Sequence, residues 1–281
     1  MSVLRLPTLF DSSHEMLRES YEYLLTFQVN SCLNVVIHYE DMDICDIYFA
    51  SFADRRYKGS LARIEQEARA MGVFHGIMCW NEDDLDDKFW EKHKQFILSS
   101  PRGFGFYIWK PQVLLQALRA IPEGAVLVFA DAGCQLNSGG VQRLREYASM
   151  VKEHPSGIIG FNTTFPTKDW TKMDTMAYFN LTDDEQAYPQ HLGGVHITHN
   201  MPHVRAFVEE WLLACERYSL IDDSPSRLQN APSFKEHRHD QSIFTILFKR
   251  HGGLSLPDET WWAPHWESNL HYPIHARRLR H

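Results

Sequence analysis

Cysteine is scarce in this sequence, with five residues among 281 and no CxxC pair. An odd number of widely spaced cysteines excludes a disulfide framework and a zinc knuckle as the basis of the fold. They stand at positions 32, 45, 79, 134 and 215. This usage indicates a reducing compartment. A chain of this length buries roughly 75% of its unfolded surface, which is enough for a core without cross-links.

Long apolar runs are lacking as well. No stretch of the sequence approaches the ~20 apolar residues that a membrane span needs. The opening residues, MSVLRLPTLFDSSHEM, do not contain the apolar stretch of a signal peptide. We therefore expect a cytoplasmic protein without a membrane span.

Positive charge is outnumbered by negative charge. The chain has 28 Lys and Arg against 36 Asp and Glu, a formal net charge of −8. A mildly acidic protein is poorly suited to binding nucleic acid or an anionic membrane surface. Neither is expected as a partner.

Aromatic residues and histidine, by contrast, are abundant. The sequence has eight Trp and sixteen His, and 44% of its residues are hydrophobic. The hydrophobic share is that of a soluble globular protein. Because the Trp and His excess lies largely in the second half, it indicates a functional site there.

Patterns of strand and helix length alternate along the first half of the chain. Apolar runs at 46–52, 74–80, 125–130 and 157–161 have the length of strands, and helical periodicity covers 60–71, 83–97, 112–120 and 140–153. This alternation predicts an α/β fold with a mostly parallel central sheet flanked by helices. After residue 165 the pattern loosens into loops rich in aromatics and His, interrupted by helices at 202–217 and after Asp240.

Asp131 follows the apolar run 125–130 directly and is followed by Ala132 and Gly133. Its position at the carboxyl end of a central parallel strand is where open α/β sheets place their ligands. The small residues after it would let a bulky anionic ligand and a cation approach the backbone. The alternative is an Asp that only caps the next turn.

Lys110 lies just before Pro111, which predicts the first position of a helix. A lysine beside the free N–H groups of a helix start makes an anion site. The alternative is a surface lysine next to a packed aromatic cluster. Asp240 precedes the apolar run 243–248. It is predicted either as a helix N-cap or as a catalytic carboxylate facing a cleft, and the two roles are compatible.

Four segments together resemble small soluble GT-A glycosyltransferases of bacterial and large-virus glycan pathways, among which are virus-encoded xylosyltransferases. The segments are GFGFYIWKP at 103–111, VFADAG at 128–133, GGVHI at 193–197 and RHDQS at 238–242. They occur in that order, and the resemblance covers roughly residues 44–278. It implies a GT-A-like, Rossmann-type sheet, a UDP-sugar donor, a glycan acceptor and Mn²⁺ or Mg²⁺.

The resemblance also implies roles for single residues. The end of the first strand and the turn after it would hold the base and ribose, Lys110 would face the donor, and Asp131 matches the first Asp of a DxD motif. Because Gly133 replaces the second Asp, a later ligand, His275 or His271, is implied to complete the metal shell. The donor-binding positions implied are Ala50, Ser51, Phe52, Asp54, Tyr57, Lys110, Ala132, Gly133, Gly193, Gly194 and Gln241.

We therefore expect a metal-dependent enzyme that moves a sugar from a UDP-sugar, with xylose first and galactose or glucose as alternatives. Asp240 would act as the base of an inverting reaction. Because Asp240-Gln241 also resembles retaining enzymes, retention stays open, as do a lectin-like binding module and a metal-dependent phosphohydrolase. The expected organisation is a lead-in segment at 1–43 packed on the domain, a nucleotide-sugar half at 44–165, and an acceptor half with a C-terminal lid at 166–281.

Overall fold

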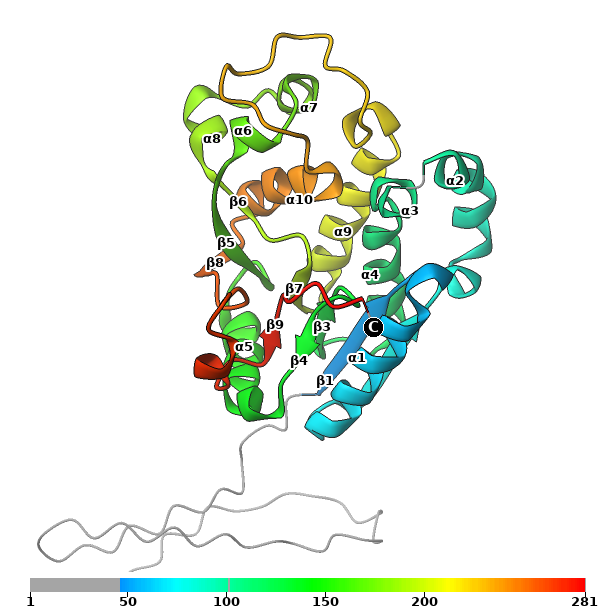
Figure 1. Ribbon diagram of the computed structural model, residues 1–281, viewed down its shortest axis with the longest axis vertical. Helices are drawn as coiled ribbons and strands as arrows, with labels where there is room; N and C mark the ends of the chain where they lie inside the picture. Colours follow the sequence, from blue (N-terminus) through cyan, green and yellow to red (C-terminus); the bar gives the residue numbers. More distant parts are fainter. Residues whose placement is uncertain (1–45, 101, 281) are drawn as a thin grey trace, which may run out of the picture. The chain divides into compact units, whose positions relative to one another are not determined.

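The computed structural model describes residues 46–100 and 102–280. The expected lead-in segment at 1–43 lies outside the described residues. The described residues all belong to the compact unit Ile44–His281 (Figure 1).

A seven-stranded mixed sheet forms the centre of this unit. Its strand order is β2-β1-β3-β7-β5-β6, with β8 paired to β5. The strands are β1 Ile47–Phe52, β2 Gly76–Trp80, β3 Val126–Ala130, β5 Ile158–Pro166, β6 Pro189–His191, β7 Val195–His199 and β8 Leu254–Pro257. Only β6 and β7 run against the direction of the other five. The predicted α/β class with a mostly parallel sheet is confirmed.

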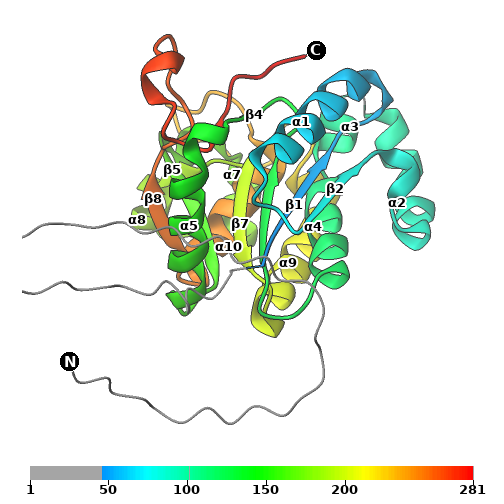
Figure 2. The same cartoon turned by 90° about the horizontal axis from the view of Figure 1, so that it is seen from below.

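Helices flank both faces of the sheet (Figure 2). The longer ones are α1 Lys58–Met71, α2 Asp87–Ser99, α4 Trp109–Ala120, α5 Val141–Glu153, α9 Pro202–Cys215 and α10 His239–Arg250. The short ones are α3 Gly103–Phe106, α6 Thr167–Trp170, α7 Met173–Tyr178 and α8 Asp183–Ala187. Single 3-10 turns are η1 Arg55–Tyr57, η2 Glu82–Asp84, η3 Ser138–Gly140, η4 Tyr218–Leu220 and η5 Trp266–Asn269.

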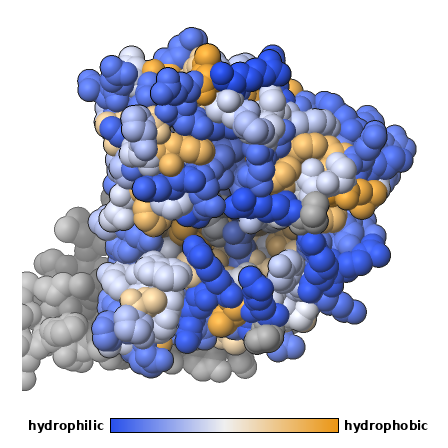
Figure 3. All heavy atoms as spheres, turned by 45° about the horizontal axis from the view of Figure 1, so that its top comes forward, coloured by the Kyte–Doolittle hydropathy of each residue, from blue (hydrophilic) through white to orange (hydrophobic). Residues whose placement is uncertain are grey.

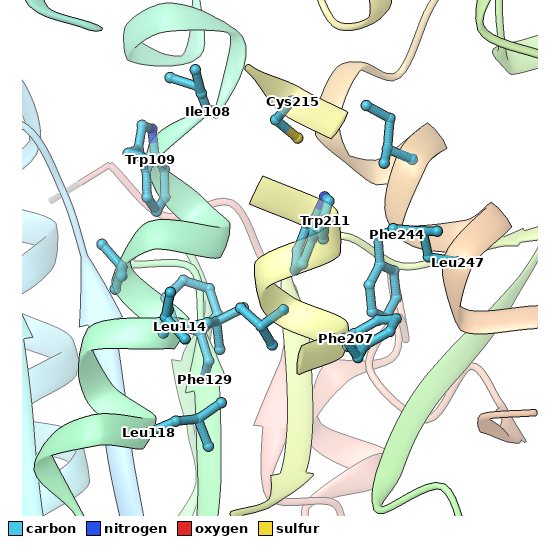
Figure 4. Close-up of a cluster of buried hydrophobic side chains, with 14 of the residues drawn as sticks. Ile108, Trp109, Leu114, Leu118, Phe129, Phe207, Trp211, Cys215, Phe244 and Leu247 are labelled. Atoms are coloured by element: carbon cyan, nitrogen blue, oxygen red, sulfur yellow. The ribbon is translucent and has the colours of Figure 1, made fainter. Parts of the chain in front are cut away.

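Strand β3 divides the core into two layers because its side chains alternate between the two faces of the sheet. Leu127 and Phe129 pack with α4, α9 and α10, the cluster drawn in Figure 4. Val126 and Val128 pack with α1 and α5 on the opposite face. All four side chains are buried. A strand that is apolar on both faces therefore belongs inside the sheet, as its sequence predicts.

Helix α1 shows how closely local sequence predicts local structure. Its buried residues Leu61, Ile64 and Ala68 recur at helical spacing. The helix ends at Gly72, whose φ of 61° is left-handed. Glycine adopts this conformation without the clash that a Cβ would introduce.

Strand β7 is the main element that the periodicity did not predict. It lies between β3 and β5, and His196 and Thr198 are buried within it. These polar residues break the apolar pattern by which a buried strand is found in a sequence. Helix α4 also begins at Trp109 rather than at Pro111. Pro111 still lies in the first turn, where its missing N–H leaves no bond unmade.

The C-terminal segment returns to the edge where β1 and β3 end. The short strand β9 Ile274–His275 pairs with β4 Gln135–Leu136. Farther along, the Leu279 N–H donates to the Gly133 carbonyl over 2.8 Å. We call residues 276–280 the C-terminal strap. None of the described helices is long and apolar enough to cross a membrane.

Candidate active site

A cleft of about 1110 Å³ opens at the carboxyl ends of β1 and β3. Figure 3 shows a hollow in this face of the molecule, bordered mostly by hydrophilic side chains. Open α/β sheets bind ligands at this edge. The cleft brings together most of the residues singled out from the sequence: Phe52, Asp54, Tyr57, Lys110, Asp131, Ala132, Gly133, Gly193, Gly194, Asp240 and Gln241.

Lys110 and Asp131 meet at the floor of the cleft. The Lys110 Nζ lies 3.0 Å from Asp131 Oδ1, and it donates to the Gly193 carbonyl over 2.6 Å. The Lys110 side chain is buried, whereas about a third of the Asp131 side chain, 36%, is exposed to the cleft. Burial by itself would lower the pKa of Lys110, but the Asp131 and Asp240 carboxylates outweigh burial and raise it. The Lys110 ammonium therefore stays charged and contacts Asp131, Asp240 and the Gly193 carbonyl.

Asp240 lies in the first turn of α10 and lines the same cleft. Its Oδ2 is 3.9 Å from Lys110 Nζ and has no hydrogen-bond partner among the described residues. Burial raises the pKa of Asp240 to about 7, Lys110 offsets part of the rise, and Asp131 adds to it. The carboxyl group therefore exchanges its proton near neutral pH.

The helix-cap interpretation of Asp240 is corrected. Helix α10 begins at His239 with Arg238 as its N-cap residue, and no side chain makes a cap hydrogen bond there. His239 has a φ of 53°, in the left-handed region. Asp240 thus lies inside the helix rather than before it, which frees its carboxylate from the capping role.

Gly193 and Gly194 bring the backbone close to the Gln241 side chain and to the Asp131 carboxylate. A Cβ on Gly194 would lie 3.0 Å from Asp131 Oδ2, and one on Gly193 would lie 2.8 Å from the Gln241 Cβ. Gln241 accepts from the Gly193 N–H over 3.2 Å and donates to Gln190 over 2.8 Å. Both ends of the Gln241 amide are thus occupied in holding this loop.

The end of β1 contributes only part of what the sequence suggested. Ala50 and Ser51 are fully buried and do not line the cleft, and the Ser51 hydroxyl donates to the Ala130 carbonyl over 2.8 Å. They hold β1 against β3. Phe52, Asp54 and Tyr57 do reach the cleft, and Tyr57 is 41% exposed.

The histidines proposed as metal ligands do not join Asp131. His275 is buried, its Nε2 contacts the Asn269 carbonyl at 3.1 Å, and neither His275 nor His271 lines the cleft. Within the described residues no group of three His, Cys, Asp or Glu could hold a metal ion. Asp131 is the remaining predicted ligand, and it already carries the Lys110 ammonium. The predicted metal ligands, Asp131 with His275 or His271, are therefore not brought together.

Several residues in the cleft, and one beside it, received no role from the sequence. Arg238 and Arg278 line the cleft from α10 and from the C-terminal strap. Arg63, on α1, donates to the carbonyls of Ala132 and Cys134 over 2.7 and 2.9 Å and so fixes the loop after Asp131. Arg238 belongs to a segment that the resemblance covers. No signal in the sequence connects Arg63 with a loop about 70 residues away.

Comparisons with known proteins find similarity in structure only. No family model and no curated protein sequence matches this chain. Mouse xyloside xylosyltransferase 1, in its apo form, aligns with 82% of this chain and 97% of its own, at 12% identity and a TM-score of 0.46. A glycosyltransferase involved in the glycosylation of the major capsid of PBCV-1 aligns with 84% of this chain and 96% of its own, at 12% identity and a TM-score of 0.46.

A third solved structure, the galactosyltransferase LgtC with donor and acceptor sugar analogues, covers 81% of this chain and 85% of its own at 11% identity and a TM-score of 0.43. All three are glycosyltransferases by name. Unrelated activities can share one fold, so a likeness at this level assigns no activity to this chain.

Proposed function

We propose that this protein transfers a sugar from a UDP-sugar to a hydroxyl group of a glycan. The observation that carries the proposal is the buried Asp240 carboxylate, whose Oδ2 finds no partner among the described residues and lies 3.9 Å from the Lys110 ammonium in a cleft of about 1110 Å³. A partnerless buried carboxylate is costly unless it serves a ligand or a reaction.

The cleft offers distinct surfaces for the two parts of the donor. Phe52, Asp54 and Tyr57 form an aromatic and acidic wall suited to a base and a ribose. Ala132 and Gly133 allow a bulky anionic group to come close to the backbone at the end of β3. UDP-xylose is the first donor to examine, with UDP-galactose and UDP-glucose beside it.

In the proposed reaction Asp240 accepts the proton of the acceptor hydroxyl. The acceptor oxygen then forms a bond to the anomeric carbon while the bond from that carbon to the diphosphate oxygen breaks, and the configuration inverts. A pKa of about 7 suits this role, because a general base works best near the operating pH. Burial raises the pKa of Asp131 although the charge of Lys110 opposes the rise, and the ion pair with Lys110 holds the Asp131 carboxyl group in place.

Retention by the same enzyme would need another group beneath the anomeric carbon. Gln241 was the sequence candidate, but its amide is occupied by Gly193 and Gln190. This arrangement favours Gln241 as a residue that positions the Gly193 loop. We therefore propose inversion.

A carbohydrate-binding protein without catalysis is the second candidate. Trp261 lines the cleft and is 46% exposed, and an exposed indole can stack on a sugar ring. A binding module, however, has no use for the buried Lys110, Asp131 and Asp240 group.

A thermal-shift screen tests the proposal. UDP or a UDP-sugar should raise the melting temperature by several degrees, while GDP, CMP and free monosaccharides should not. Stabilisation by a monosaccharide alone would favour the binding module. No response to any UDP compound, together with no release of UDP from UDP-sugars, would contradict the transferase.

A further inference from the structure

The cleft is cationic although the chain is acidic. Its lining contains six Lys or Arg and four Asp, whereas the whole chain has a formal net charge of −8. The six are Arg56, Arg102, Lys110, Arg238, Arg278 and Arg280. A cleft of opposite sign to the rest of the protein indicates an anionic ligand.

Two of these cations already face carboxylates in the cleft. Lys110 lies between Asp131 and Asp240, and Arg56 pairs with Asp54 over 2.7 Å. Arg102 pairs with Asp223 and Glu236, which do not line the cleft, over 3.1 and 3.4 Å. Among the described residues, Arg238 and Arg278 line the cleft without an ion pair to any of its four Asp residues.

Contacts with Trp170 and Glu236 fix the position of the Arg238 guanidinium. This group lies 4.2 Å from the centre of the Trp170 ring, and Glu236 is 3.2 Å from one of its terminal nitrogens. Its Nε is buried and has no hydrogen-bond partner among the described residues. Burial, together with the positive charges of Arg278 and Arg102, lowers the pKa of Arg238 even though Glu236 opposes the effect. A cluster of like charges that the fold holds together lowers its energy when an anion binds.

The backbone of Arg278 lies at the place where a second metal-binding Asp would stand, and its guanidinium lies 5.5 Å from the centre of the Trp261 ring in the same cleft. A Cβ on Gly133 would lie 3.4 Å from the Arg278 Cα, and the Leu279 N–H binds the Gly133 carbonyl. Arg278 has a φ of 58°, which is unusual for a residue with a side chain. The strap therefore occupies the space beside Gly133.

We propose that the guanidinium groups of Arg238 and Arg278 bind the diphosphate of the donor in place of a divalent cation. This inference rests on the proposed function for its ligand, a nucleoside diphosphate. Arginine presents paired N–H donors that match phosphate oxygens. In the reaction the two groups stabilise the negative charge that develops on the departing diphosphate.

Calorimetric titration of the full-length protein with UDP tests the proposal, once in excess EDTA and once with Mn²⁺. The wild type should bind UDP with dissociation constants that agree within about threefold in the two buffers. Arg238→Gln and Arg278→Gln should each weaken UDP binding at least about tenfold, the usual scale of a lost charge-assisted contact. Binding of uridine, which carries no phosphate, should change less than about twofold.

Arg277→Gln is the matched control. Arg277 neighbours Arg278 in the strap but does not line the cleft, and it donates to Gln135 over 2.8 Å. Its variant should bind UDP as the wild type does. Arg278→Lys, which keeps the charge, should recover part of the loss. Circular dichroism melts of all variants show whether they are folded.

Two results would overturn the proposal: UDP binding that improves tenfold or more with Mn²⁺, or Arg238 and Arg278 variants that bind UDP like the wild type. Wild-type UDP binding by these variants is also the result expected if the two arginines bind an anionic group of the acceptor instead of the donor diphosphate. Transfer activity is measured separately. Transfer that requires Mn²⁺ would contradict this inference and support the proposed function. UDP binding in EDTA without any transfer would support this inference and contradict the proposed function.

Discussion

Lys110 and Asp131 form an ion pair across the floor of the cleft, with 3.0 Å between Nζ and Oδ1. The same ammonium lies 3.9 Å from Asp240 Oδ2. One positive charge thus serves two carboxylates, and the protonation of Asp240 depends on a residue at the start of α4. Both the stability of the fold and the protonation of the cleft carboxyl groups therefore depend on Lys110.

Lys110→Met should destabilise the protein strongly at alkaline pH. Removing one partner of a buried ion pair costs about 3 kcal/mol when the other partner is partly exposed. For a chain of this size that corresponds to a fall in melting temperature of roughly 6–12 °C. The loss should be largest near pH 8 and smaller near pH 5, because the stranded carboxylates can then bind protons.

The double variant Lys110→Met/Asp131→Asn is the control for this experiment. It removes both charges of the pair, so its melting temperature at pH 8 should lie well above that of Lys110→Met alone. Additive losses in the two single variants would show that the pair does not contribute to stability.

Asp240→Asn should make stability less dependent on pH. Burial raises the pKa of Asp240 in the folded state from the ordinary 3.8 of an aspartate to about 7. The folded state therefore holds this proton more tightly than the unfolded state does. The resulting stability is present below about pH 4 and is lost as the pH rises through about 7.

Thermal melts between pH 5 and pH 8 measure this effect. The wild type should lose stability relative to Asp240→Asn by about 1.4 kcal/mol for each pH unit up to about pH 7 and little more above it. Parallel curves for the two proteins would mean that Asp240 is not held in a proton-binding environment.

Arg63→Met should slow catalysis although Arg63 does not line the cleft. Arg63 donates to the carbonyls of Ala132 and Cys134 on either side of Gly133, and it pairs with Glu67. Losing these bonds should let the loop after Asp131 shift and reduce kcat about tenfold or more, since small misplacements of reacting groups are costly.

Arg69→Met is the comparison for Arg63→Met. Arg69 also lies on α1 and pairs with Glu65 one turn away, but its side chain is 64% exposed. An exposed pair of this kind contributes at most about 0.5 kcal/mol, so kcat should remain at the wild-type value. Equal effects of the two substitutions would deny Arg63 a positioning role.

The sequence predicted those parts of the site that local patterns determine. Asp131 could be placed because an apolar run without alternation belongs to a buried parallel strand. Helix α1 followed from the helical periodicity over 60–71, and it ends one residue later at the left-handed Gly72. In these cases the neighbours in sequence are also the cause of the structure.

The remaining features depend on segments that meet only in the folded chain. Lys110 was expected to face the donor, but its closest carboxylate lies 21 residues away in Asp131. Buried polar residues His196 and Thr198 concealed β7. Arg238 and Arg278 approach one another only because the strap returns to Gly133. The spacing of residues in the sequence does not predict such contacts, because they join segments that are far apart along the chain.

The most direct test of the account is transfer by wild type and Asp240→Asn, followed by NMR of the anomeric proton in the product. We expect inversion by the wild type, with kcat/KM falling as the pH drops below about 7. Asp240→Asn should still bind UDP and transfer at least about a hundredfold more slowly, the loss expected for a general base. Near wild-type transfer by Asp240→Asn, or a product with the donor's own configuration, would contradict the role of Asp240 as the base of an inverting transfer.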